Sequence, residues 1–149
     1  MGQVGGSISD DDHGYAEMGI RLRQIRAAVK VGVDDRPHEP SGQPTDEIGT
    51  YHEFGQGNMP ERSFLRAWVD EKERDIREKI ADLALAQVLD GGPDWRIPFG
   101  QWAVDRIRER IWALIPPPLK IATVLRKGGI TPLVDTMQLV NAILDELEE

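Results

Sequence analysis

Residues 48–68 read IGTYHEFGQGNMPERSFLRAW and place a polar, glycine-rich loop between two apolar segments. Apolar side chains recur every three residues from Ile48 to Phe54, which favours a turn of helix over a strand. Two glycines then break that helix, and Pro60 or Ser63 begins the next one, because a first helical turn does not need the N–H that proline lacks. The stretch is therefore predicted to redirect the chain between two packed elements.

The adjacent residues His52 and Glu53 raise the question of metal or acid–base chemistry in this loop. Neighbouring side chains point in different directions on a helix or a strand, so these two do not converge on one ion. A zinc-protease pattern needs a second histidine on the same helical face, and none follows here. We therefore predict no catalytic residue, no cofactor site and no metal ligand, and interpret the stretch as a structural hinge. The hinge residues are Glu53, Phe54, Gly55, Pro60, Arg62, Phe64 and Leu65.

Length and composition limit the classes of protein that the chain can belong to. Its 149 residues suit one domain with a core of its own, and the absence of cysteine excludes disulfides and thiolate metal sites. A net charge of −8 argues against wrapping nucleic acid, because phosphate binding needs a surplus of lysine and arginine on one face. The charge is compatible with a protein that surrounds DNA without gripping it.

The sequence shows no signal for a membrane or for secretion. No apolar run has the length of a membrane-spanning helix. The first residues lack the basic start and the apolar centre of a signal peptide. We expect a soluble protein that is made in the cytoplasm and does not associate with a membrane.

The N-terminal third is predicted to contain an arm, a helix, a strand and a long loop. Residues 1–13 are rich in glycine, serine and aspartate and are expected to form a flexible arm or a short edge strand. Apolar residues at steps of three and four from Tyr15 to Val29 predict a helix. The alternation at Val29–Val33 predicts a strand with one buried face. Residues 34–47, with three prolines, are predicted to form a loop that a partner orders.

The second half is predicted to be mainly helical. An apolar stripe from Leu65 to Leu89 predicts a long helix, which Gly91 ends because glycine readily adopts a left-handed cap. A further helix is expected over residues 98–115, where three consecutive prolines stop it.

The remaining residues have a weaker pattern. Residues 119–136 have no sustained period and are predicted to form a second long loop, which is locally basic. Residues 137–149 fit a helix and a strand equally well. Residues 14–149 are expected to form a single domain.

Two groups of residues together resemble one known family. The first reads HEFG at 52–55 and MPERSFLR at 59–66. The second reads PPLK at 117–120, AT at 122–123, RKGG at 126–129, PLVDT at 132–136 and QL at 138–139. In this order the set resembles the neck and tail-completion proteins of tailed bacteriophages, also described as minor tail components or virion morphogenesis proteins. The resemblance covers residues 14–149, and Met137 stands where that family has glycine.

The resemblance implies an α+β fold in which a small antiparallel sheet packs against a long helix, with a second helix and long inter-subunit loops. It also implies a turn of helix at 136–142 and a strand at about 143–148. The implied role is that of a structural virion protein without catalytic activity. Such a protein forms a ring at the head-to-tail junction, completes the neck or tail, and surrounds the DNA channel.

The implied partners are other copies of the chain and the neighbouring neck, connector and tail proteins. Rings of six copies match the tail, and rings of twelve match the portal. DNA would pass through without sequence-specific binding. We expect the arm and the two long loops to contact neighbouring subunits, since such segments order against a partner. The residues expected at these contacts are Asp34, Arg36, His38, Glu39, Lys120, Arg126 and Lys127.

Two other classes of protein stay open from the sequence. One is a small phage-encoded hydrolase that uses Glu53 with His52, which requires a concave pocket around a perturbed carboxylate. The other is a monomeric adaptor that binds a single partner helix. The oligomeric state of the purified protein distinguishes a ring subunit from both.

Overall fold

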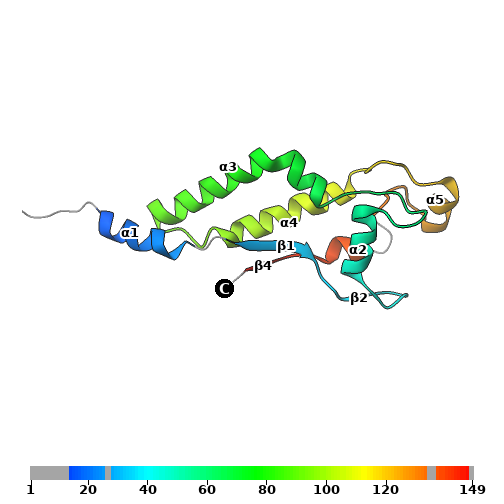
Figure 1. The fold of residues 1–149 in the computed structure, drawn as a ribbon, viewed down its shortest axis with the longest axis horizontal. Coiled ribbons are helices and arrows are strands. Elements are labelled where there is room, and N and C mark those ends of the chain that lie inside the picture. The colour runs from blue at the N-terminus through cyan, green and yellow to red at the C-terminus, as the bar shows by residue number, and fades with distance from the viewer. Residues whose placement is uncertain (1–13, 26–27, 134–136, 148–149) are drawn as a thin grey trace, which may run out of the picture.

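The computed structural model describes residues 14–25, 28–133 and 137–147. Within these ranges the chain combines helices with short antiparallel strands, which confirms the predicted α+β class. The elements in chain order are α1 (Tyr15–Gln24), β1 (Val29–Val33), β2 (Pro37–His38), β3 (Gln43–Pro44), α2 (Thr45–Phe54), α3 (Arg66–Asp90), α4 (Arg96–Trp112), α5 (Ile121–Lys127), α6 (Gln138–Asn141) and β4 (Ile143–Leu147). The molecule is elongated, with α1 at one end and α5 at the other (Figure 1).

The main sheet joins the early strand to the last one. β1 pairs antiparallel with β4, from Val29 opposite Leu147 to Val33 opposite Ile143. A two-stranded ribbon is marginal by itself in water, so it needs a helix to cover one face. Here α4 covers the sheet and α3 runs beside α4 (Figure 1). The core lies along α4, whose buried residues include Phe99, Ala103, Val104, Ile107 and Ile111.

Gly100 allows α4 to approach β4 closely. A Cβ atom at this position would lie 2.3 Å from Oδ2 of Asp145 and 2.8 Å from its Cβ. Real Cβ atoms do not come this close to a neighbour, so a larger residue must push the strand or its side chain away.

Gly100→Ala is therefore expected to lower the free energy of unfolding by about 1–3 kcal/mol, because overpacking outweighs the helix propensity of alanine. Gly19→Ala in α1 is the matched control, since a Cβ there has no atom within 4 Å. The control is expected to gain about 0.5–1 kcal/mol. Urea unfolding of both variants measures the difference, and equal shifts in the same direction would contradict the close approach.

Met137 begins the C-terminal segment in a left-handed conformation, with φ at 65°. A side chain is disfavoured there by about 1–2 kcal/mol, and glycine is not. This is the position at which the resembled family has glycine. Methionine replaces glycine here, but residue 137 still has the left-handed backbone conformation that glycine favours.

A Gly–Ala comparison at position 137 isolates this backbone effect, because both variants lose the methionine side chain. Met137→Gly is expected to be about 1 kcal/mol more stable than Met137→Ala. Gln101 is an exposed helical position, and there Gln101→Ala is expected to be about 1 kcal/mol more stable than Gln101→Gly. Thermal unfolding of the four variants tests both orders, and the same order at both positions would count against a left-handed residue 137.

Several predicted boundaries need correction. The helix expected from Tyr15 ends at Gln24, and the helix expected from Pro60 or Ser63 begins at Arg66. The loop predicted over residues 34–47 contains the β2–β3 hairpin and the first turn of α2.

The loop predicted over residues 119–136 contains a helix, α5. A helix that packs on the core shows an apolar stripe in its sequence. α5 lacks such a stripe, and its apolar residues Ile121 and Leu125 face solvent. The C-terminal helix and strand implied by the resemblance are present as α6 and β4. The arm predicted for residues 1–13 lies outside the described residues.

Candidate functional site

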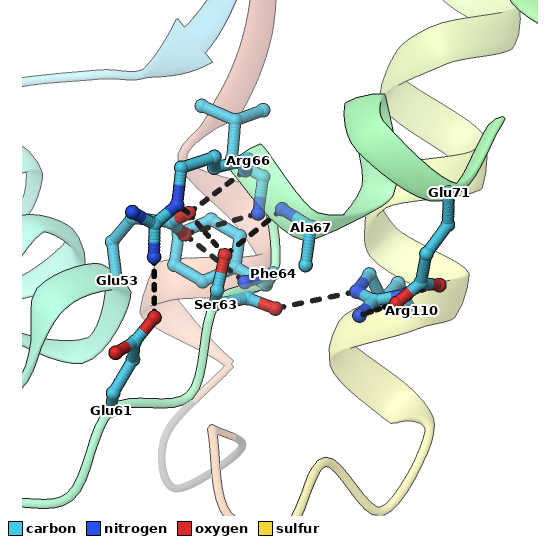
Figure 2. A network of polar contacts seen from close by, with 9 residues as sticks. Glu53, Glu61, Ser63, Phe64, Arg66, Ala67, Glu71 and Arg110 are labelled. Atoms are coloured by element: carbon cyan, nitrogen blue, oxygen red, sulfur yellow. Dashed lines mark hydrogen bonds and ion pairs between the residues drawn. The ribbon is translucent and has the colours of Figure 1, made fainter. Parts of the chain in front are cut away.

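The hinge between α2 and α3 is built around the buried carboxylate of Glu53. Its Oε2 accepts hydrogen bonds from the backbone N–H groups of Phe64 at 3.0 Å and Leu65 at 3.1 Å. Its Oε1 accepts one from the N–H of Arg66 at 2.8 Å and one from the hydroxyl of Ser63 at 2.5 Å. Figure 2 shows these donors converging on the carboxylate. The first N–H groups of a helix have no partner within the helix, so Glu53 caps α3 from the end of α2.

The electrostatics of Glu53 follow from this arrangement. Burial is the largest single influence and raises the pKa of the carboxyl group. The hydrogen bonds from Ser63 and from the backbone of Leu65, Arg66 and Phe64 outweigh it, so the pKa lies below its ordinary value. The helix dipole of α3 acts in the same direction. Glu53 is therefore an ionised acceptor with occupied oxygens, and this is the opposite of the raised pKa that a general acid needs.

Neighbouring side chains hold the hinge from outside. The hydroxyl oxygen of Ser63 accepts a further hydrogen bond from the N–H of Ala67 at 2.9 Å. The guanidinium group of Arg66 bonds to Glu61 and lies 5.1 Å from the ring centroid of Phe54. Phe54 is 59% exposed, so it contacts α3 through this cation–π pair rather than through the core. Within the hinge, Phe54 therefore makes a surface contact.

Gly55 and Phe64 differ in their surroundings within the hinge. Gly55 has φ of 73°, and a Cβ there would lie 3.0 Å from the backbone nitrogen of Glu61. Only glycine fits both the dihedral angle and the space. Phe64 is 1% exposed and belongs to the core, whereas Leu65 is half-buried and Pro60 is exposed.

Arg62 connects the hinge to the proline segment after α4. It is buried, and its Nε and Nη2 atoms donate to the carbonyl oxygen of Pro117 at 3.0 and 2.7 Å. Its own N–H donates to the carbonyl oxygen of His52 at 2.7 Å. Burial lowers the pKa of Arg62, because a cation loses hydration there. The MPERSFLR and PPLK segments, which are far apart in the sequence, thus meet at the guanidinium group of Arg62.

His52 faces a different cavity from its neighbour Glu53. Glu53 is among the residues that line a hollow of about 290 Å³ next to the start of α3, whereas His52 lines a separate cavity of about 680 Å³. The Nδ1 atom of His52 is buried and has no hydrogen-bond partner among the described residues. Burial first, and then the charges of Arg62, Lys127 and His38, lower the pKa of His52 to about 4. The two residues do not converge, as the adjacent positions predict.

The larger cavity gathers basic side chains from three parts of the chain, and we call it the cationic pocket. Its walls come from the β2–β3 hairpin, from α2 with the hinge, and from residues 117–133 and 138–139. No aspartate or glutamate is among the lining residues that the structure describes. Its basic lining residues are His38, His52, Arg62, Lys120, Arg126 and Lys127.

The residues expected at subunit contacts divide into two groups. His38, Lys120, Arg126 and Lys127 meet in the cationic pocket, although they come from two separate loops. The other three do not line it. Asp34 accepts from the guanidinium group of Arg36 at 2.7 Å, and Glu39 exchanges backbone hydrogen bonds with the side chain of Gln138 at 2.6 and 2.9 Å.

Sequence reasoning missed two residues that shape this region. Ser63 bridges Glu53 and α3, and a serine shortly before a helix is a signal for a cap. Gln138 ties α6 to the β2–β3 hairpin, and nothing in its local sequence indicates the partner. Both residues belong to the segments that carry the family resemblance.

Within the described residues, no group of three or more histidine, cysteine, aspartate or glutamate side chains is placed to hold a metal ion. None of the described helices is long and apolar enough to span a bilayer. Comparisons with protein-family models, with curated proteins and with solved structures each find no match to this chain. The resemblance to phage neck proteins therefore stays a prediction from the sequence.

Proposed function

We propose that this chain is a structural virion protein at the head-to-tail junction of a tailed bacteriophage, where copies form a ring around the DNA channel. The observation that carries the proposal is exposed apolar surface at both ends of the subunit. These ends are marked by α1 and α5 in the elongated molecule (Figure 1). Surface apolar residues that occur singly need no explanation, whereas groups of them mark interaction sites.

The first group lies at the α1 end of the molecule. Arg21 of α1 donates to the carbonyl oxygens of Val88 and Leu89, both at 3.1 Å, and so holds α1 against the C-terminal part of α3. The exposed large apolar residues on α1 and on the C-terminal part of α3 are Tyr15, Ile20, Leu22, Leu85 and Leu89.

The second group lies at the α5 end. Ile121 and Leu125 of α5 are 79% and 77% exposed. Trp112, Leu114 and Ile130 are also exposed, and the latter two border an apolar hollow of about 270 Å³ next to α5. Contacts between two different ends of identical subunits are heterologous, and they generate a ring when the rotation closes.

The contacts of the motif residues support the same proposal. The HEFG segment binds the MPERSFLR segment through Glu53, and Arg62 binds Pro117 of the PPLK segment. These residues hold helices and loops in place, and the oxygens of Glu53 are occupied by donors. The net charge of −8 fits a lumen that repels phosphate and lets a duplex pass.

The double variant Ile121→Ser/Leu125→Ser tests the proposal. The wild-type protein is expected to form closed rings in native mass spectrometry and electron microscopy, and the variant is expected to stay monomeric. Both side chains are largely exposed, so the unfolding free energy is expected to change by less than about 1 kcal/mol. Val69→Ser/Leu144→Ser is the matched control, since these exposed residues belong to neither end.

In the phage that carries this gene, the same variant is expected to yield filled heads and complete tails that do not join. The control variant is expected to yield joined, infectious particles. Joined particles from a variant that forms no rings would defeat the proposal. Ring formation without any copy of the chain in purified virions would defeat it as well.

A further inference from the structure

The cationic pocket concentrates positive charge in an acidic protein. Arg62 lies buried in its wall, and Lys120 and Arg126 are exposed beside it. Among the described residues, neither Lys120 nor Arg126 has a carboxylate within ion-pair distance, whereas most other arginines of the helices do. Charges left unpaired beside a cavity attract an anionic ligand.

The same cavity is lined by apolar side chains as well as by cations. Ile48, Leu133 and Leu139 border it, together with Met59 and several prolines. Its volume of about 680 Å³ lies within the range of binding pockets. A ligand that fills it therefore needs an apolar group next to negative charges, which favours a short acidic peptide over an inorganic anion.

We propose that the cationic pocket binds residues 7–12, Ser-Ile-Ser-Asp-Asp-Asp, of a second copy of this chain. The three aspartates would face Arg62, Lys120 and Arg126, and Ile8 would enter the apolar part of the cavity. A carboxylate near His52 also supplies an acceptor for an imidazole whose Nδ1 has no described partner.

The length of the chain determines that the aspartates come from another copy. α3 has 25 residues and is about 37 Å long at 1.5 Å per residue. Arg21 of α1 bonds to the C-terminal part of α3, whereas Arg62 precedes its N-terminus and borders the pocket. Gly14 therefore lies at the far end of the molecule from the pocket, as the positions of α1 and α5 in Figure 1 show.

An extended chain spans at most about 3.5 Å per residue, so Asp10 lies within about 14 Å of Gly14. The aspartates of a chain consequently cannot reach its own pocket. They can reach the α5 end of a neighbour that abuts the α1 end. The inference rests on the head-to-tail association proposed above and adds its second, electrostatic contact.

A peptide of residues 3–13 with a fluorescent label tests the inference on protein that lacks residues 1–13. We expect saturable binding that weakens as salt is added, because the contact is electrostatic. Lys120→Glu/Arg126→Glu is expected to raise the Kd at least tenfold, and so is a peptide with its three aspartates changed to asparagine. Lys72→Glu/Arg74→Glu on α3 changes the net charge equally outside the pocket and is expected to leave the Kd within twofold.

A peptide with three lysines in place of the aspartates is expected to regain binding to Lys120→Glu/Arg126→Glu. No binding, or a Kd that the pocket variants leave unchanged, overturns the inference. Displacement of the peptide by a single-stranded oligonucleotide of equal charge, at equal concentration, would assign the pocket to nucleic acid and overturn it too. Rings that form while the peptide does not bind would remove only the arm contact and leave the apolar association standing.

Discussion

Glu53→Gln is expected to lower the free energy of unfolding by about 2–4 kcal/mol at pH 7, which is a large fraction of the stability of a small domain. The carboxylate accepts four hydrogen bonds, three of them from backbone N–H groups at the start of α3. Glutamine offers one oxygen, and its NH₂ group would face donors. A buried donor without a partner costs about 1–3 kcal/mol.

Glu61→Gln provides the matched control for this substitution. Glu61 is also next to the hinge and pairs with Arg66, but both side chains are half exposed. An exposed ion pair contributes only about 0–1 kcal/mol, so the control is expected to unfold close to the wild type. Urea unfolding followed by circular dichroism measures both variants. Equal stability of Glu53→Gln and Glu61→Gln would refute the capping role.

The pH dependence of the unfolding free energy of Glu53→Gln provides a second test of the capping role. Because the pKa of Glu53 is lowered in the folded state, its stabilisation is present above the unfolded pKa and is lost as the pH falls through the folded value. The difference between wild type and Glu53→Gln is therefore expected to narrow below about pH 4, near the ordinary pKa of a glutamate. A difference that stays constant into acid would show that charge plays no part.

Acidification is expected to destabilise the protein further through His52. The pKa of this histidine is about 4 in the folded protein, against the ordinary value of 6.5. Between these values the unfolded chain binds more protons than the folded one, so stability falls as the pH falls from about 7 to 4. A difference of this size corresponds to about 3 kcal/mol in total, at 1.4 kcal/mol per pKa unit.

His52→Leu separates this effect from that of Glu53. The variant is expected to lie within about 1 kcal/mol of the wild type at pH 7 and to be about 2–3 kcal/mol more stable than it at pH 4. NMR titration of the histidine Cε1 protons, with the resonance assigned by its loss in the variant, measures the pKa directly. An imidazole at position 52 that titrates near 6.5 would contradict the buried environment.

The hinge and the cationic pocket differ in how far the sequence predicts them. Gly55 and Phe64 are identified from local patterns, since a glycine turn and an apolar helix start depend on near neighbours. The donors that surround Glu53 lie ten to thirteen residues away, and only the folded chain brings them to it. Phe54 follows Ile48 and Tyr51 at steps of three, and this spacing suggests a buried apolar face. In the structure its ring is exposed and lies under the guanidinium group of Arg66, which the spacing does not predict.

The sequence by itself determined the elements whose signals are local: the alternation that makes β1, the stripes of α3 and α4, and the glycine after α3 that takes a left-handed cap. These signals arise from side-chain periodicity and backbone sterics within a few residues. Tertiary structure alone decided that β1 pairs with β4, and that basic residues of two distant loops border one cavity. Both contacts depend on the direction in which each turn sends the following segment. The side-chain pattern within a single segment does not specify that direction.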